Sequence, residues 1–187
     1  MRKALFAIVV AMVLLSVDAS AQRSGAGRKV GAFEVEVGVG LATAATNMTE
    51  FGKSREGVDA NVELRYNLAD KPIDVGIYFA LCQIYRSEQV NDIAKRYSFV
   101  SENLLLTSDY NFFQGRKVSP FVGVGLGVSW SEINADGTLN GAHFAVMPRV
   151  GVELAHHLRV TLAYKVFDRA NNHLVISLGY AFGGGKR

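Results

Sequence analysis

Strict alternation of apolar and polar side chains recurs along this chain. Between Val58 and Leu68 every even position is apolar and every odd position is polar or charged. Because successive side chains of a β-strand point to opposite faces, such a segment has one apolar face and one ionic face. A soluble sandwich buries the apolar face, whereas a membrane barrel turns it toward lipid. The pattern therefore predicts strands and leaves these two folds open.

The N-terminus has the three-part layout of a secretory signal peptide. Basic Arg2 and Lys3 precede an apolar run from Ala4 to Leu15, and small residues follow at 19–21, where signal peptidase would cut. We predict a signal peptide over residues 1–21 and a flexible leader over 22–31. No later stretch reaches roughly 18 consecutive apolar residues, so a membrane-spanning mature chain would have to be a closed barrel.

Charge and cysteine content exclude several classes of protein. Cys82 is the single cysteine, so no intrachain disulfide can form. The formal net charge is +3, and loss of residues 1–21 would remove two cations and one anion. No stripe of Lys and Arg with interleaved aromatic residues occurs, and we predict no nucleic-acid partner.

Residues 32–187 are predicted to form one barrel domain of about eight strands. The predicted strands are 33–42, 58–68, 73–86, 99–112, 120–131, 144–154, 158–166 and 174–182. Segments of about ten residues suit tilted membrane strands, whereas soluble strands average five or six. Short connections alternate with long ones at Thr43–Gly57, Ser87–Ser98 and Glu132–His143. This rhythm is typical of an outer-membrane barrel with tight periplasmic turns and longer extracellular loops.

Aromatic residues gather near both ends of the predicted strands. One group is expected at the periplasmic rim: Phe33, Tyr66, Tyr110, Phe112, Tyr180 and Phe182. The other is expected at the extracellular rim: Tyr85, Trp130, Phe144 and Tyr164. Two such belts are typical of the two lipid–water interfaces, which favours the membrane barrel.

Two local features bear on the predicted strands. Glycines at 38 and 40 and at 123, 125 and 127 fall on inward faces, where they would leave space for long side chains from across a narrow barrel. Pro148 lies inside a predicted strand and has no N–H to donate, so we expect a β-bulge there.

Three segments resemble the small eight-stranded outer-membrane barrels of the OmpX type and of the OmpA membrane domain: Leu174–Phe182, Pro120–Gly127 and Pro148–Leu154. The resemblance implies an all-β, antiparallel, up-and-down transmembrane barrel in the bacterial outer membrane. It also implies two partners, outer-membrane lipid and the barrel-insertion machinery. Leu178, Tyr180 and Phe182 would then form the C-terminal insertion signal, although here the chain continues through residues 183–187.

The inward faces are predicted to carry a network of charged side chains that fills the lumen. Its members are Glu34, Glu36, Asp59, Glu63, Arg65, Asp74, Arg86, Asp109, Arg149, Glu153, Arg159 and Lys165. An eight-stranded barrel is only wide enough for side chains to fill its interior. We therefore expect a structural ion network and a plugged polar lumen rather than a pore.

The sequence predicts no catalytic, cofactor or metal site. His156 and His157 lack further ligands at metal spacing and are expected at the surface. Function is expected to be non-catalytic, in envelope structure or in surface contact through the extracellular loops. Three alternatives stay open: a lipid-modifying enzyme using Ser131, His143 and Asp136, a narrow channel, and a soluble lipocalin-like barrel.

Overall fold

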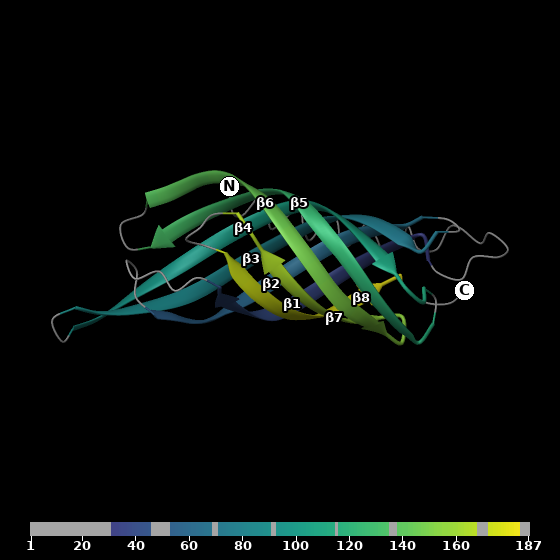
Figure 1. The fold of residues 1–187 in the computed structure, drawn as a ribbon, viewed down its shortest axis with the longest axis horizontal. Helices are drawn as coiled ribbons and strands as arrows, with labels where there is room; N and C mark the ends of the chain where they lie inside the picture. The colour runs from purple at the N-terminus through teal and green to yellow at the C-terminus, as the bar shows by residue number, and fades with distance from the viewer. Residues whose placement is uncertain are drawn as a thin grey trace.

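The computed structural model describes residues 31–45, 53–68, 71–90, 93–114, 116–134, 138–167 and 172–183. These residues form eight strands: β1 (Phe33–Ala44), β2 (Lys53–Asn67), β3 (Ile73–Val90), β4 (Ile93–Asn111), β5 (Val118–Asn134), β6 (Thr138–Leu154), β7 (Leu158–Lys165) and β8 (His173–Phe182). Each strand pairs antiparallel with its neighbours in sequence, and β8 closes on β1 (Figure 1). The prediction of an all-β, eight-stranded, up-and-down barrel is confirmed. The predicted signal peptide (1–21) and nearly all of the leader (22–31) lie outside the described residues.

The register of the strands fixes the width of the barrel. Following paired residues around the barrel from Glu34 leads back to β1 at Ala44, ten residues further along the strand. A stagger of this size tilts all strands steeply against the barrel axis, as Figure 1 shows. Eight strands enclose an interior that side chains can fill.

The strands are longer at one end of the barrel than the sequence predicts. The connections after β2, β4 and β6 are short, as predicted. At the opposite end, β3 continues to Val90 and β4 starts at Ile93, so a long loop is absent between these two described strands. The predicted loops Ser87–Ser98 and Glu132–His143 are therefore largely strand, and part of Thr43–Gly57 is too. Polar residues dominate these segments, so no apolar alternation marked them. Figure 1 shows the β3–β4 hairpin extending well beyond the other strands.

The bulge predicted at Pro148 is wrong. Pro148 pairs in regular register with Val124 of β5. Toward β7, Arg149 pairs with Ala163 and Val146 with Val166, which is the same register on both sides of the proline. Val146 exchanges both backbone hydrogen bonds with Val166, so the N–H missing at Pro148 faces β7 as well. The ladder is interrupted there without an extra residue.

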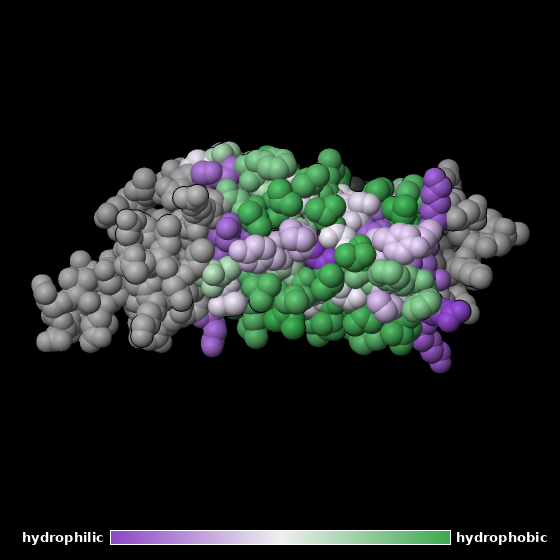
Figure 2. All heavy atoms as spheres, in the orientation of Figure 1, coloured by the Kyte–Doolittle hydropathy of each residue, from purple (hydrophilic) through white to green (hydrophobic). Residues whose placement is uncertain are grey.

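A belt of apolar side chains surrounds the outside of the barrel. Leu126 and Leu162 face outward and are exposed, whereas Arg65 and Lys165 face inward and are each 1% exposed. Figure 2 shows the belt between hydrophilic side chains at both ends. All ten predicted rim aromatics lie on the outer face, and most are exposed. An exposed apolar belt with a charged interior is the arrangement of a barrel in lipid and excludes the lipocalin-like alternative.

No helix in the described part of the chain is long and apolar enough to cross a membrane.

Candidate functional site

The lumen holds nearly all of the charged residues that the sequence placed there. Glu34, Glu36, Asp59, Glu63, Arg65, Asp74, Asp109, Arg149, Arg159 and Lys165 are buried on the inner face, and Glu153 is partly buried. Arg86 lies in β3, in a stretch whose side chains are outside the described residues. These carboxylates outnumber their cations, and the register sets Glu36 opposite Glu63 and Asp74 opposite Asp109.

Arg149 of β6 joins two of these carboxylates at the centre of the lumen. Its Nη1 and Nη2 donate to both oxygens of Glu63 at 2.8 and 2.6 Å. Its Nε and Nη2 donate to both oxygens of Asp109 at 2.7 and 2.9 Å. Thr107 Oγ1 donates to Glu63 Oε1 at 2.5 Å. Two bidentate pairs on one guanidinium are a strong, geometrically specific arrangement, and they tie β2, β4 and β6 together across the lumen.

Two further arginines order the periplasmic half of the lumen. Arg159 Nη2 donates to Asp109 Oδ2 at 2.6 Å, and its guanidinium lies 3.7 Å from the ring centroid of Phe121. Arg65 Nη2 donates to Glu34 at 2.9 Å and lies 3.5 Å from a carboxylate oxygen of Glu36. Each arginine thus reduces the repulsion between neighbouring carboxylates.

A separate ion pair lies closer to the extracellular end. Lys165 Nζ of β7 donates to Asp59 Oδ2 of β2 at 2.6 Å, and Asn61 Nδ2 donates to Asp59 Oδ1 at 3.1 Å. The ammonium also lies 5.4 Å from the ring centroid of Tyr78. This pair links opposite walls, because β2 and β7 are not neighbours in the sheet.

Inward glycines provide the room for these side chains. A Cβ placed on Gly123 would collide with Asp109 Oδ1, and one placed on Gly179 would collide with Glu36 Oε1. A Cβ on Gly38 would lie 2.6 Å from Asn61 Oδ1. The glycines are therefore needed by the ionic side chains beside them, as the sequence predicted for Gly38 and Gly123.

Beside the Lys165–Asp59 pair, the extracellular half of the lumen holds an apolar cluster that the sequence pattern did not predict. The buried cluster there consists of Ala42, Tyr78, Ala80, Cys82, Ile84, Phe99, Leu105, Ala145, Met147, Ala163, Phe167 and Val175. Phe99 and Phe167 stack with ring centroids 6.5 Å apart. In sequence, Leu105 only disturbed the alternation of its strand, whereas in the barrel it points inward and is buried. We call this group the apolar plug.

The residues considered for lipid chemistry do not form a lipid-facing group. Ser131 is 2% exposed and shares the inward-facing side of β5 with Ser129 and Gly125. His143 pairs with Ser129 on the same side, and Asp136 lies outside the described residues. Among the described residues, no group of three or more His, Cys, Asp or Glu side chains is arranged to hold a metal ion.

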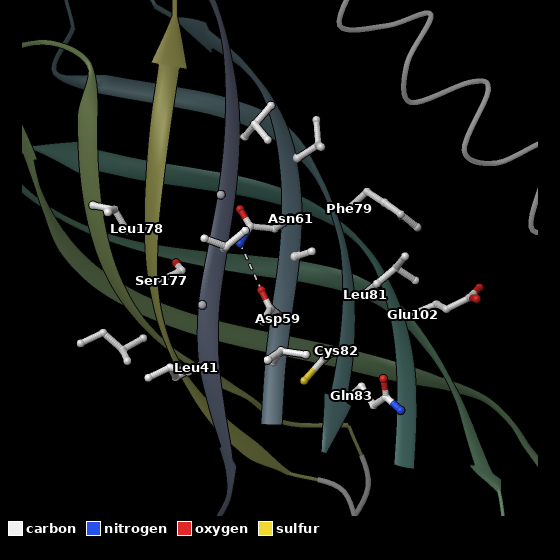
Figure 3. Close-up of a pocket in the computed structure, with 18 of the residues that line it drawn as sticks. Leu41, Asp59, Asn61, Phe79, Leu81, Cys82, Gln83, Glu102, Ser177 and Leu178 are labelled. Atoms are coloured by element: carbon white, nitrogen blue, oxygen red, sulfur yellow. Dashed lines mark hydrogen bonds between the residues drawn. The ribbon is translucent and has the colours of Figure 1, made fainter. Parts of the chain in front are cut away.

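The outer wall carries one charged residue that sequence reasoning missed. Glu102 of β4 lies on the lipid-facing side, paired with Leu81 and with Trp130. It borders a pocket lined mainly by apolar side chains of β8 and β1–β4 (Figure 3). In Figure 3, Phe79, Leu81 and Glu102 lie on one side of this pocket and Leu41 and Leu178 on the other. The signal was present in the sequence, since Glu102 lies in phase with Leu104 and Leu106.

The predicted insertion signal lies on the outer face of β8, where Leu178, Tyr180 and Phe182 are all exposed. Its recognition by the insertion machinery stays a prediction. The β6–β7 turn contacts this strand: the His157 ring stacks on Tyr180 with centroids 5.4 Å apart, and its Nδ1 lies 3.0 Å from the Ala181 carbonyl oxygen. The positive φ of Ala155 (52°) and His156 (67°) is the pattern of a type I′ turn. His157 therefore packs against β8 and is not merely a surface histidine.

Replacing His157 with alanine should lower the free energy of unfolding by about 1 kcal/mol, because one hydrogen bond and one ring contact to β8 are lost. Urea unfolding in lipid vesicles measures this change. His156→Asn is the matched control, because asparagine tolerates a positive φ. An equal loss in both variants would contradict a specific role for His157.

A closed antiparallel barrel with an apolar outer belt, two aromatic rims and a filled lumen defines the class of small outer-membrane β-barrels. Residues 7–182 match the family model described as outer membrane protein beta-barrel domain. The chain belongs to this family and is a protein of the bacterial outer membrane.

Two of the solved structures that resemble this chain, Neisserial surface protein A and OprG, share its fold. Neisserial surface protein A has a TM-score of 0.57 and 12% identity, over 82% of this chain and 98% of that chain. OprG from Pseudomonas aeruginosa has a TM-score of 0.51 and 14% identity, over 81% and 96%. Ail of Yersinia pestis, crystallised with a heparin analogue, has a TM-score of 0.46 and 13% identity, over 80% and 99%. No curated protein matches the chain in sequence.

Proposed function

We propose that this protein is a non-catalytic surface protein whose barrel anchors it in the outer membrane and whose extracellular hairpins make the functional contacts. The observation that supports this proposal most strongly is the length of β3 and β4, which stay paired up to Val90 and Ile93. Val90 lies five residues beyond the rim residue Tyr85, so the paired hairpin extends about 16 Å further along the strand. A paired ribbon of this kind presents backbone hydrogen-bonding groups along its edges.

The filled lumen supports an anchoring role over transport. The ion network crosses the periplasmic half, and the apolar plug and the Lys165–Asp59 pair occupy the extracellular half. A solute would have to displace paired charges and then pass stacked aromatic rings. The barrel should therefore be silent in a planar lipid bilayer at high protein concentration, and reproducible stepwise conductance would contradict this expectation.

The position of Ser131 supports a non-catalytic role over lipid chemistry. A lipid-modifying serine must reach a substrate in the membrane, whereas Ser131 is buried on the lumen side. We expect lipid A to have the same acyl chains in cells with and without the protein. A change in lipid A that Ser131→Ala abolishes would favour the enzyme instead.

The decisive experiment for the surface role is a shortened hairpin. Residues 86–97 are replaced by a two-residue turn. This turn then connects Tyr85 to Ser98, which pair with each other in the barrel. A cold-versus-boiled detergent gel confirms that the shortened barrel still folds. Strains that lack the protein then receive either the full or the shortened chain. We expect the shortened chain to restore envelope resistance to detergent but not attachment to surfaces. Full restoration of both would overturn the contact role and leave an envelope-structural one.

A further inference from the structure

We propose that the outer wall formed by β3, β4 and β5 binds the ammonium headgroup of an outer-membrane lipid, with Glu102 as its counter-ion. This binding site is distinct from the extracellular hairpins and does not depend on the surface role proposed above. It rests on the position of Glu102 and on the chemistry of the side chains around it.

Among the described side chains of the lipid-facing belt, Glu102 is the one that carries a charge. Tyr110 marks the level of the periplasmic rim and Trp130 that of the extracellular rim. Between these two levels, the other outward side chains of the described strands are apolar or uncharged. The described residues offer Glu102 no hydrogen bond and no ion pair. An ionised side chain facing lipid is costly, and such residues almost always pair with another group. Since the described part of the chain offers no cation to this carboxylate, we infer that its partner comes from outside the barrel wall.

One neighbouring side chain, Gln83, adds a hydrogen-bond acceptor beside the carboxylate. Gln83 Nε2 of β3 donates to Ser98 Oγ of β4 at 2.7 Å. Because the amide nitrogen is used in this way, the Gln83 carbonyl oxygen remains an acceptor. Gln83 pairs with Val100, so Glu102 is its diagonal neighbour on the same face, at a usual Cβ separation of about 7–8 Å. An ammonium group has three donors and no acceptor, which matches this set.

An aromatic ring lies beside the same position. Trp130 of β5 is directly paired with Glu102 and is 40% exposed, whereas Tyr85 of β3 lies farther along the same face, paired with Ser98. Ring faces attract cations, and a carboxylate beside aromatic rings is a favourable setting for an ammonium ion. Tryptophan also marks the lipid–water interface. The carboxylate therefore lies at the depth where lipid headgroups begin.

The surface below Glu102 suits an acyl chain. Leu81, Phe79 and Leu104 continue from it toward the middle of the belt, and the first two line the pocket shown in Figure 3. The occupant must combine a hydrocarbon chain with a cationic donor at its upper end, and an amine-bearing lipid meets both conditions. A second copy of this face would set carboxylate against carboxylate. A divalent cation requires more oxygen ligands than Glu102 and Gln83 supply.

Lipid retention by the full-length barrel tests the site. The protein is placed in nanodiscs of phosphatidylglycerol doped with phosphatidylethanolamine or with its N-acetylated, uncharged form, and bound lipid is counted by native mass spectrometry. We expect preferential retention of phosphatidylethanolamine and about a tenfold weaker retention in Glu102→Gln, as for loss of a charge-assisted hydrogen bond. Glu56→Gln is the matched control, because Glu56 is an exposed glutamate near the end of β2.

Three results would overturn the proposal. They are equal retention of the charged and the acetylated lipid, unchanged retention in Glu102→Gln, and an equal loss in Glu56→Gln. A second measurement is independent of mass spectrometry. In vesicles without amine lipid, Glu102→Leu should raise the urea midpoint of unfolding, because an unpaired charge leaves the lipid face. Phosphatidylethanolamine should stabilise the native protein and not this variant, and equal stabilisation of both would also contradict the site.

Discussion

Replacing Arg149 with methionine should lower the free energy of unfolding by about 3–5 kcal/mol, the usual cost of removing one partner from a buried ion pair. The variant loses four hydrogen bonds and leaves Glu63 and Asp109 without their shared cation. Methionine has a similar reach, so packing changes little and the effect reports on charge. Because Arg149 joins strands on different sides of the lumen, the loss weakens the barrel as a whole.

Unfolding in urea, with the barrel in lipid vesicles, measures this effect. The single tryptophan, Trp130, faces lipid and reports on the transition through its fluorescence. Arg116→Met is the matched control, because Arg116 is exposed in a periplasmic turn and its ring contact with Phe113 is worth about 0.5–1 kcal/mol.

A triple variant distinguishes two causes of the lower stability: the carboxylates left without a cation, and the hydrogen bonds lost with Arg149. Adding Glu63→Gln and Asp109→Asn to Arg149→Met removes the uncompensated carboxylates, so part of the stability should return. If Arg149→Met unfolds no more easily than Arg116→Met, the lumen network contributes no stability. If the triple variant is less stable than Arg149→Met, the carboxylates are stabilised by something other than Arg149.

A single methyl group at Gly123 should destabilise the barrel by about 2–3 kcal/mol, within the range for overpacking a filled interior. The added Cβ meets Asp109 Oδ1 and lies 2.6 Å from the Ser108 carbonyl oxygen. Asp109 cannot move away without giving up its bonds to Arg149 and Arg159. A backbone carbonyl inside a sheet ladder has little freedom to move either.

Gly125→Ala is the control for Gly123→Ala, since both glycines lie on the same face of β5. A Cβ at Gly125 first meets the terminal methyl of Met147 at 3.1 Å and a methyl of Leu105 at 3.2 Å. These flexible ends can shift, so the change should be below about 1 kcal/mol. Urea midpoints in vesicles compare the two variants. Equal losses would show that β propensity, and not the crowding of Asp109, governs this strand.

The fold was predictable from the sequence because each strand of a membrane barrel must turn apolar side chains outward to lipid and polar ones inward. Val58–Leu68 alternates without a break, and its apolar side chains do face outward. The ends of the strands could not be found in this way. The sequence from Ser87 to Ser98 is mostly polar and does not alternate, so no pattern marked it as strand.

The pairing inside the lumen was beyond the reach of sequence. Alternation predicted that Arg149 faces inward, but its two carboxylate partners come from strands that only the register brings together. The apolar plug was missed for a related reason. Inward positions such as Phe99 and Met147 alternate along their strands with outward apolar residues and lie among mostly small or polar inward residues, so no sequence pattern groups them into one cluster. Glu102 was missed because the strand that carries it was the least regular.

The position of the apolar plug above the arginine-bridged part of the lumen bears on attempts to engineer a nanopore from this barrel. Trimming the extracellular hairpins would not open a current path, since the obstruction consists of wall side chains such as Phe99, Phe167 and Met147. Replacing these residues with glycine or serine would widen the lumen on its extracellular side only. The constriction formed by Arg149 and its two carboxylate partners would still limit the ionic current. Removing Arg149 would destabilise the barrel itself.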